Sequence, residues 1–315
     1  LSPELYSYNF LLDGVKIVDP GSVYITRDIT SETNIFILSD KKGDCGDLYT
    51  VNEVPHGNVS KVWYDSPTLK MQRRMTVYTP AGYDKGKDYP VLYLLHGAGG
   101  DEDAWTTLGR AQHILDNLIA TGKAKPMVVV MTNGNPNCQA APGEWSAGQY
   151  IPSFYGYQGA KPAATMDESF PDVMNYVESH YKVAKDKAHR AICGLSMGGG
   201  HSFDISRRFP TKFDYIGLFS AGLHVSTTGD FRNDFYKQLQ GNEEAKTQLA
   251  TLFKNKPKLY WIGMGKTDFL YKSSADLRRY FDEKGYKYTY LETEGGHIWR
   301  NWRVYLTEFA QKIFK

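Results

Sequence analysis

Short apolar runs alternate with longer amphipathic segments over most of the chain. The apolar runs predict buried strands at residues 91–95, 127–131, 191–193, 215–219 and 259–262, with a further strand at 286–291. The amphipathic segments predict helices, including 104–120, 170–181, 198–209, 275–284 and 299–314. Alternating strands and helices are typical of a mostly parallel sheet covered by helices on both faces, so we expect an α/β fold.

The first 56 residues follow a different pattern. Short strand-like runs lie at 6–12, 15–18 and 34–38, and the pair Asp13-Gly14 between the first two is a hairpin signal. We therefore predict a small all-β unit at 1–56 and a boundary near Pro55, followed by a main domain at 57–315. That domain is expected to begin with an antiparallel hairpin formed by 60–69 and 72–79.

The strongest chemical signal is the GxSxG motif centred on Ser196. It stands directly after the strand 191–193 and directly before a predicted helix. A sharp turn from strand to helix forces the central residue into strained backbone angles and leaves no room for side chains beside it, which accounts for Gly194 and Gly198. The motif predicts that Ser196 is a nucleophile; the alternative is a glycine-rich turn that only eases packing.

A serine hydroxyl needs a base, and the base needs an acid to fix its tautomer. In this arrangement the chain order is Ser, acid, His. His297 is the only one of the eight histidines that follows His224, and it lies in a turn after the last predicted strand. Asp268 follows the strand before that one. We assign His297 as base and Asp268 as acid, in preference to Glu292 and Glu294, which are too near His297, and to Asp276 and Asp282, which fall in a predicted helix.

An oxyanion hole needs backbone N–H groups aimed at the ester oxygen. We assign one to Met197, directly after the nucleophile, and the other to Ala98 in the glycine-rich turn after the strand 91–95. A phosphate cradle is the rival interpretation of this turn. It fits neither nucleotide-binding glycine pattern, and the acidic run 101–103 that follows would repel phosphate.

Composition narrows the function further. The formal net charge is +2, and basic pairs such as Arg73-Arg74 have acids nearby, as on solvated faces, so no nucleic-acid partner is expected. The chain contains neither an HExxH motif nor a CxxC pair among its three cysteines, so we expect no metal and no cofactor. The longest apolar runs are too short to span a membrane. The chain shows no signal peptide at its start, so we expect any such peptide to have been removed or never present.

Two motifs together carry a resemblance to a known family. They are GLSMGG at 194–199 and GGHxWxxWR at 295–303, joined by the Leu-Leu-His-Gly sequence at 94–97. The chain resembles the esterase D-like α/β-hydrolases, and more narrowly carbohydrate esterase family 1, the feruloyl and acetyl xylan esterases. The resemblance covers about 58–315 and implies a catalytic triad of Ser196, Asp268 and His297. Residues 8–20 resemble an early-set, immunoglobulin-like module related to glycogen-binding domains, without its first strands.

The resemblance implies release of ferulate or related hydroxycinnamates from arabinoxylan-type polysaccharide. A polymeric substrate would place the protein outside the cytoplasm, secreted or periplasmic. Aromatic residues of the long segment 132–165 are expected to line the acyl slot: Trp145, Tyr150 and Tyr155, with Phe154 and Tyr157 beside them. The alternatives are an acetyl xylan esterase, an enterochelin-type siderophore esterase, an acyltransferase like the mycolyltransferases, and a non-catalytic glycan-binding protein.

Overall fold

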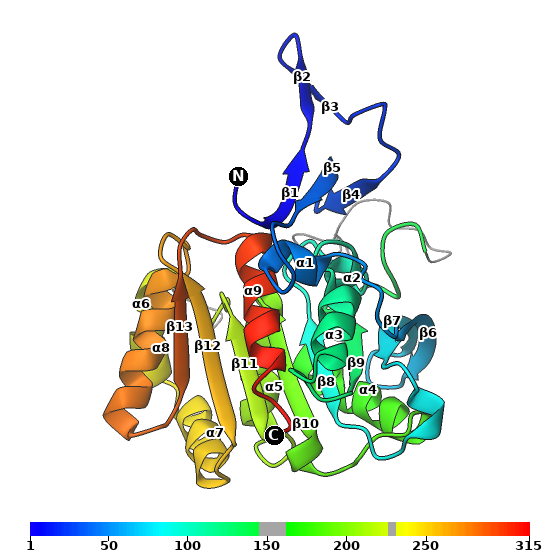
Figure 1. Ribbon diagram of the computed structural model, residues 1–315. Coiled ribbons are helices and arrows are strands. Elements are labelled where there is room, and N and C mark those ends of the chain that lie inside the picture. The colour runs from blue at the N-terminus through cyan, green and yellow to red at the C-terminus, as the bar shows by residue number, and fades with distance from the viewer. Residues whose placement is uncertain (145–161, 226–230) are drawn as a thin grey trace.

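The computed structural model describes residues 1–144, 162–225 and 231–315. Within them an eight-stranded sheet forms the centre, in the order β13-β12-β11-β10-β8-β9-β7-β6 (Figure 1). The strands are β6 (Asn58–Ser66), β7 (Met71–Thr79), β8 (Val91–Leu95), β9 (Val128–Thr132), β10 (Arg190–Leu195), β11 (Tyr215–Phe219), β12 (Leu259–Gly265) and β13 (Thr289–Thr293). The six strands from β13 to β9 in this order are parallel to one another. Strand β7 pairs antiparallel with β9, and β6 pairs antiparallel with β7.

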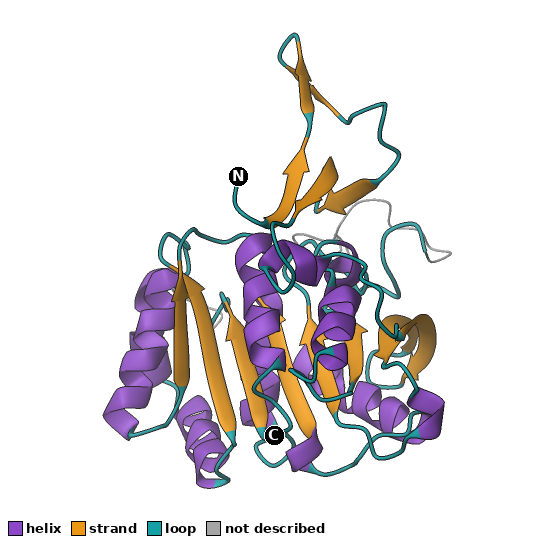
Figure 2. Cartoon of the chain, viewed as in Figure 1, coloured by secondary structure: helices purple, strands orange, loops and turns teal. Residues whose placement is uncertain are grey.

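Helices cover both faces of the sheet (Figure 2). One face carries α1 (Cys45–Tyr49), α2 (Ala104–Thr107), α3 (Ala111–Ala120) and α9 (Trp299–Ala310). The other carries α4 (Met166–His180), α5 (Met197–Arg208), α6 (Phe231–Gln240), α7 (Glu243–Lys254) and α8 (Tyr271–Lys284). In β8, Tyr93 packs into one core and Leu94 into the other, because neighbouring side chains of a strand point to opposite faces. The expectation of an α/β-hydrolase fold is confirmed.

The helices differ from the prediction in two places. The single helix predicted at 104–120 is wrong: α2 and α3 are separated at Gly109 and Arg110. Arg110 has a left-handed φ of 54°, and a Cβ on Gly109 would lie 2.5 Å from the Trp105 side chain, so the chain turns there. Helices α6 and α7, which lie between β11 and β12, were not predicted. Short 3₁₀ helices occur at Tyr83–Lys85 and Lys187–His189.

Residues 1–56, called the N-terminal unit below, form two small antiparallel sheets and α1. One sheet has the order β1 (Glu4–Tyr8), β5 (Ser31–Leu38), β4 (Ile25–Asp28), and the other pairs β2 (Phe10–Leu12) with β3 (Val15–Ile17). Asp13 and Gly14 both have positive φ, as a tight hairpin turn requires, so the predicted hairpin is confirmed. The strand pattern did not predict α1. That the unit is an immunoglobulin-like module bounded near Pro55 stays a prediction.

The N-terminal unit stands beyond the edge of the sheet at which the parallel strands end (Figure 1). Ligands of open α/β sheets bind outside the carboxyl ends of the strands. The unit therefore lies at the edge where the predicted site residues are expected to gather.

Candidate functional site

Ser196 stands at the turn from β10 into α5 with a strained backbone. Its φ is 52° and its ψ −114°, angles that a residue with a side chain rarely adopts. Its N–H donates to the Phe219 carbonyl at 2.9 Å, and its own carbonyl accepts from the Gly222 N–H at 2.8 Å. A Cβ on either Gly194 or Gly198 would lie 2.5 Å from a neighbouring backbone atom, so only glycine fits on either side of this turn.

Asp268 and His297 are brought together by the turns that follow two neighbouring parallel strands. Asp268 lies after β12 and His297 after β13, and His297 Nδ1 donates to Asp268 Oδ2 at 2.8 Å. The carboxylate is buried, and its Oδ1 accepts from the Leu270 N–H at 2.9 Å. Because Nδ1 carries the proton, His297 keeps Nε2 as an acceptor. This geometry is the one that an acid needs to orient a general base, as the sequence predicts for this pair.

The turn at 97–100 passes directly beside Ser196. A Cβ on Gly97 would lie 3.2 Å from the Ser196 Cβ, and the turn closes with a 3.1 Å hydrogen bond from the Gly100 N–H to the Gly97 carbonyl. Ala98 lies within this turn. Met197 is the first residue of α5, and the first N–H groups of a helix have no partner inside the helix. Both amides assigned to the oxyanion hole thus belong to segments that border Ser196.

His96 fastens the start of this turn to the segment after β9. Its Nδ1 donates to the Gly97 carbonyl at 2.7 Å, and its Nε2 accepts from the Gly134 N–H at 2.7 Å. The ring is therefore neutral, with its proton on Nδ1. Burial lowers the pKa of His96, which agrees with this tautomer.

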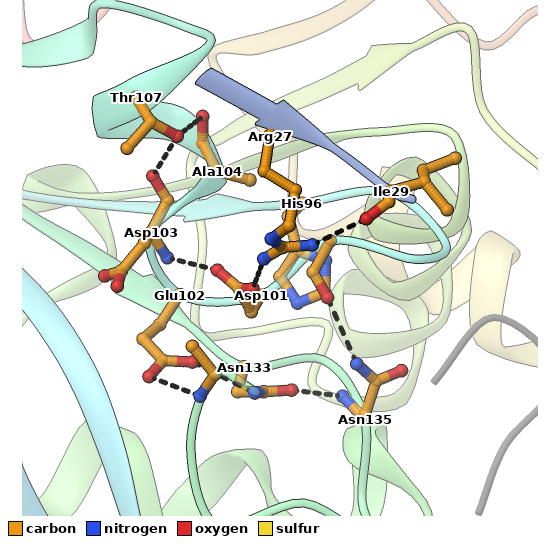
Figure 3. Close-up of polar contacts among 12 residues, drawn as sticks. Arg27, Ile29, His96, Asp101, Glu102, Asp103, Ala104, Thr107, Asn133 and Asn135 are labelled. Carbon is orange, nitrogen blue, oxygen red and sulfur yellow. Dashed lines mark hydrogen bonds and ion pairs between the residues drawn. The ribbon is translucent and has the colours of Figure 1, made fainter. Parts of the chain in front are cut away.

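Each residue of the acidic run 101–103 that follows the turn has ion-pair or hydrogen-bond partners, and Figure 3 shows Arg27 beside Asp101 and Asn133 beside Glu102. Asp101 pairs with Arg27, and Asp103 with Lys61 and Arg74. Glu102 is fully buried: Arg74 Nε donates to its Oε1 at 2.7 Å, as does the Ala141 N–H at 2.9 Å, and Asn133 Nδ2 donates to its Oε2 at 3.0 Å. Through these ion pairs and hydrogen bonds, the acidic run anchors the turn at 97–100 to the rest of the fold.

The arginine pair at 73–74 is not a solvated face, so that part of the charge interpretation is wrong. Both side chains are buried in β7. Arg73 donates to the carbonyls of Asn133, Asn135 and Cys138, and thereby shapes the segment after β9. Arg74 pairs with the buried Glu102, and the sequence alone gives no sign of this pairing, because it does not show that either side chain is buried.

Sequence reasoning also missed the aromatic rings around His297. Trp302 meets the imidazole edge-on with ring centroids 4.9 Å apart, and Phe269 lies against it at 4.6 Å. Trp302 in turn contacts Trp299, whose ring packs on Trp105 of α2. Of the two tryptophans in the GGHxWxxWR motif, Trp302 packs directly on the histidine and Trp299 packs on Trp302.

Some predicted residues fall outside this description. Trp145, Tyr150 and Tyr155, proposed for substrate binding, lie outside the described residues, as do Phe154 and Tyr157. Among the residues that the structure describes, no group of three or more His, Cys, Asp or Glu side chains is arranged to hold a metal ion. None of the helices described there is long and apolar enough to cross a membrane.

Comparisons with known proteins agree with this geometry. A family model described as putative esterase matches residues 66–313. An endo-1,4-beta-xylanase/feruloyl esterase of Xylanibacter ruminicola is 31% identical over the whole chain, which spans 39% of that protein's length. An acetyl esterase of Caldicellulosiruptor saccharolyticus is 23% identical over 80% of the chain and 90% of that protein. A CE1 ferulic acid esterase structure from Anaeromyces mucronatus is 26% identical, with a TM-score of 0.65 over 86% of this chain and 96% of that one.

Proposed function

Because the chain belongs to the putative esterase family, we propose that it is a serine esterase that releases ferulate or related hydroxycinnamates from arabinoxylan-type polysaccharide. The observation that carries the proposal is the 2.8 Å hydrogen bond between His297 and the buried Asp268, at the sheet edge where Ser196 is held in a strained turn. The substrate class is supported by the similar xylanase/feruloyl esterase and ferulic acid esterase.

The proposed reaction has two steps. Ser196 Oγ attacks the ester carbonyl while His297 Nε2 takes the serine proton, and the N–H groups of Met197 and Ala98 bind the oxyanion. His297 then gives the proton to the leaving sugar alcohol, and an acyl-enzyme remains. Water attacks this intermediate with His297 again as base, and the carboxylic acid leaves. The chain's own residues supply every group, without a cofactor.

Asp268 sets the direction of this proton transfer. Its buried carboxylate accepts the Nδ1 proton of His297, so Nε2 is the nitrogen that meets the nucleophile. The same carboxylate stabilises the imidazolium that forms when the serine proton is taken. A polymeric cell-wall substrate would place the protein outside the cytoplasm, secreted or periplasmic, and we propose this localisation with the substrate.

The deciding experiment measures ferulate and acetate released from feruloylated and acetylated arabinoxylan oligosaccharides, with Ser196→Ala as the blank. We expect ferulate release that falls by on the order of 10⁶ in the variant, as when a serine nucleophile is removed. Acetate release alone would make the protein an acetyl xylan esterase. Release of neither would contradict the proposal and direct the test to catecholate siderophore esters.

A fluorophosphonate probe separates an enzyme from a binding protein. The probe reacts with a serine that a base has activated, so the wild type is expected to be labelled at Ser196 and Ser196→Ala is not. An unlabelled wild type that still binds xylan oligosaccharides would favour the non-catalytic, glycan-binding alternative.

A further inference from the structure

A buried ion pair joins the N-terminal unit to α9 of the main domain. Glu4 of β1 is 2% exposed, and Arg303 Nη2 of α9 donates to its Oε1 at 2.9 Å. Arg303 also donates to the Leu5 and Leu108 carbonyls, at 3.2 and 3.0 Å. A buried pair with these additional hydrogen bonds holds one geometry, so the unit has a fixed orientation over the sheet edge.

A second contact of the same unit reaches the turn beside Ser196. Arg27, near the end of β4, places its guanidinium between two acceptors: Nη1 donates to the Ile29 carbonyl at 3.0 Å, and Nη2 donates to Asp101 Oδ2 (Figure 3). Ile29 has a left-handed φ of 56°, which turns its carbonyl back toward Arg27. The Ile29 carbonyl, directly after β4, thus helps to orient the guanidinium toward Asp101.

Asp101 is buried although it carries a charge. It is 3% exposed, its Oδ1 accepts from the Asp103 N–H at 2.9 Å, and its Oδ2 accepts from Arg27. A buried carboxylate that loses its cation is left with an uncompensated charge, and a short turn relieves this by moving toward water. Asp101 directly follows Gly100, the last residue of the turn.

The other contacts that hold the turn come from residues of the main domain. His96 holds its start, Asn135 Nδ2 donates to the Gly100 carbonyl at 3.2 Å, and Glu102 is held by Arg74. Arg27, in contrast, belongs to the N-terminal unit. The neighbouring Asp28 faces Trp299 at the start of α9: burial raises the pKa of Asp28, and a hydrogen bond with Trp299 opposes that rise.

We infer that Arg27 is a positioning residue of the esterase site, and that through Asp101 the N-terminal unit sets the place of the turn that carries the Ala98 amide. The inference rests on the proposed function, in which this amide binds the oxyanion. An oxyanion donor acts only within about 2.7–3.1 Å of the charge, so a small shift of the turn weakens the transition state more than substrate binding.

The test compares Arg27→Gln with Arg27→Lys and with Lys16→Gln, which removes an exposed charge from β3 of the same unit. For methyl ferulate we expect Arg27→Gln to lower kcat about tenfold, part of the 10²–10³ that loss of a whole oxyanion donor costs, with KM changed less than about twofold. Arg27→Lys is expected to recover part of kcat, and Lys16→Gln to match the wild type. Far-UV circular dichroism and Tm establish that each variant is folded.

A second variant tests the route through the carboxylate. Asp101→Asn breaks the same contact without leaving a charge buried, so it is expected to lower kcat less than Arg27→Gln does. The double variant is expected to be no slower than Arg27→Gln alone, because both changes break one contact. Labelling of Ser196 by a fluorophosphonate is expected to slow in parallel, since that reaction also develops charge in the oxyanion hole.

The outcomes separate the inference from the function on which it rests. The wild type could be active while Arg27→Gln keeps its kcat and labelling rate, or changes only KM. This result would overturn the role of Arg27 and leave the proposed function standing. Additive losses in the double variant would also count against it. A wild type that neither cleaves esters nor reacts with the probe would remove the proposed function, and the inference with it.

Discussion

The two sides of Ser196 are held in different ways. On the acid–base side, Asp268 and His297 each lie in a short turn after their own strand, and one 2.8 Å hydrogen bond joins them. On the oxyanion side, the segment 96–103 is held by partners from the N-terminal unit, β7 and the loop after β9. The first side depends on local turns, whereas the second depends on charges that are distant in sequence.

This difference predicts different consequences of mutation. A change on the acid–base side is expected to act mainly on the proton transfer that we propose, because a single hydrogen bond joins the two side chains. A change on the oxyanion side removes a buried partner, so it affects stability and catalysis together.

Among changes that separate the two sides, the largest effect is expected from Asp268→Asn. An amide cannot hold both the Nδ1 proton and the imidazolium as a carboxylate does, so the histidine loses its productive tautomer, and kcat for methyl ferulate is expected to fall by on the order of 10⁴ with Tm nearly unchanged. Asp276→Asn, in α8, is the control and is expected to retain wild-type kcat. Equal losses in the two variants would refute the assignment of Asp268 as the acid.

The next largest effect is expected from Glu102→Gln, which breaks the buried pair with Arg74. Urea unfolding is expected to show a loss of about 3–5 kcal/mol, the usual cost of removing one member of a buried pair. The displaced turn is expected to lower kcat about 10- to 100-fold as well. Glu144→Gln removes an exposed partner of the same arginine and is expected to cost less than about 1 kcal/mol. Similar free energies for both variants would show that burial of Glu102 is not what holds the turn.

The oxyanion side is also expected to be sensitive to acid, because burial lowers the pKa of His96. The unfolded chain binds a proton on this residue below about pH 6.5 while the folded protein does not, so the free energy of unfolding falls as pH drops below that value. One such proton amounts to at most about 1.4 kcal/mol per pH unit. In His96→Asn the slope between pH 6.5 and 5 is expected to be shallower than in the wild type by up to that amount. A slope in His96→Asn equal to that of the wild type would show that His96 binds its proton as readily in the folded protein as in the unfolded chain, which would contradict the lowered pKa.

The same difference explains what the sequence predicts. The strands of the main sheet, the hairpin at Asp13 and the meeting of Asp268 with His297 follow from local periodicity, turn residues and strand order. The burial of Arg73 and Arg74 does not, because no local pattern distinguishes a buried arginine from a solvated one. Whether a charge is buried depends on partners such as Glu102 that the fold brings together. The break at Gly109 was missed because a left-handed residue interrupts an otherwise regular helical pattern.

The smallest effect is expected from Trp302→Phe, which tests whether the acid–base side receives any support from packing. The Trp302 ring lies edge-on to His297 at 4.9 Å, and such aromatic contacts contribute about 0.5–1.5 kcal/mol. A smaller ring keeps part of this, so kcat is expected to fall about two- to fourfold. Trp261→Phe is the matched control: it thins the same core, where Trp261 packs on Phe219, and it keeps the Trp302 ring beside the imidazole. If Tm falls equally in both variants but kcat falls only in Trp302→Phe, Trp302 orients His297. An equal kcat in both variants would mean that the hydrogen bond to Asp268 is sufficient to orient the imidazole.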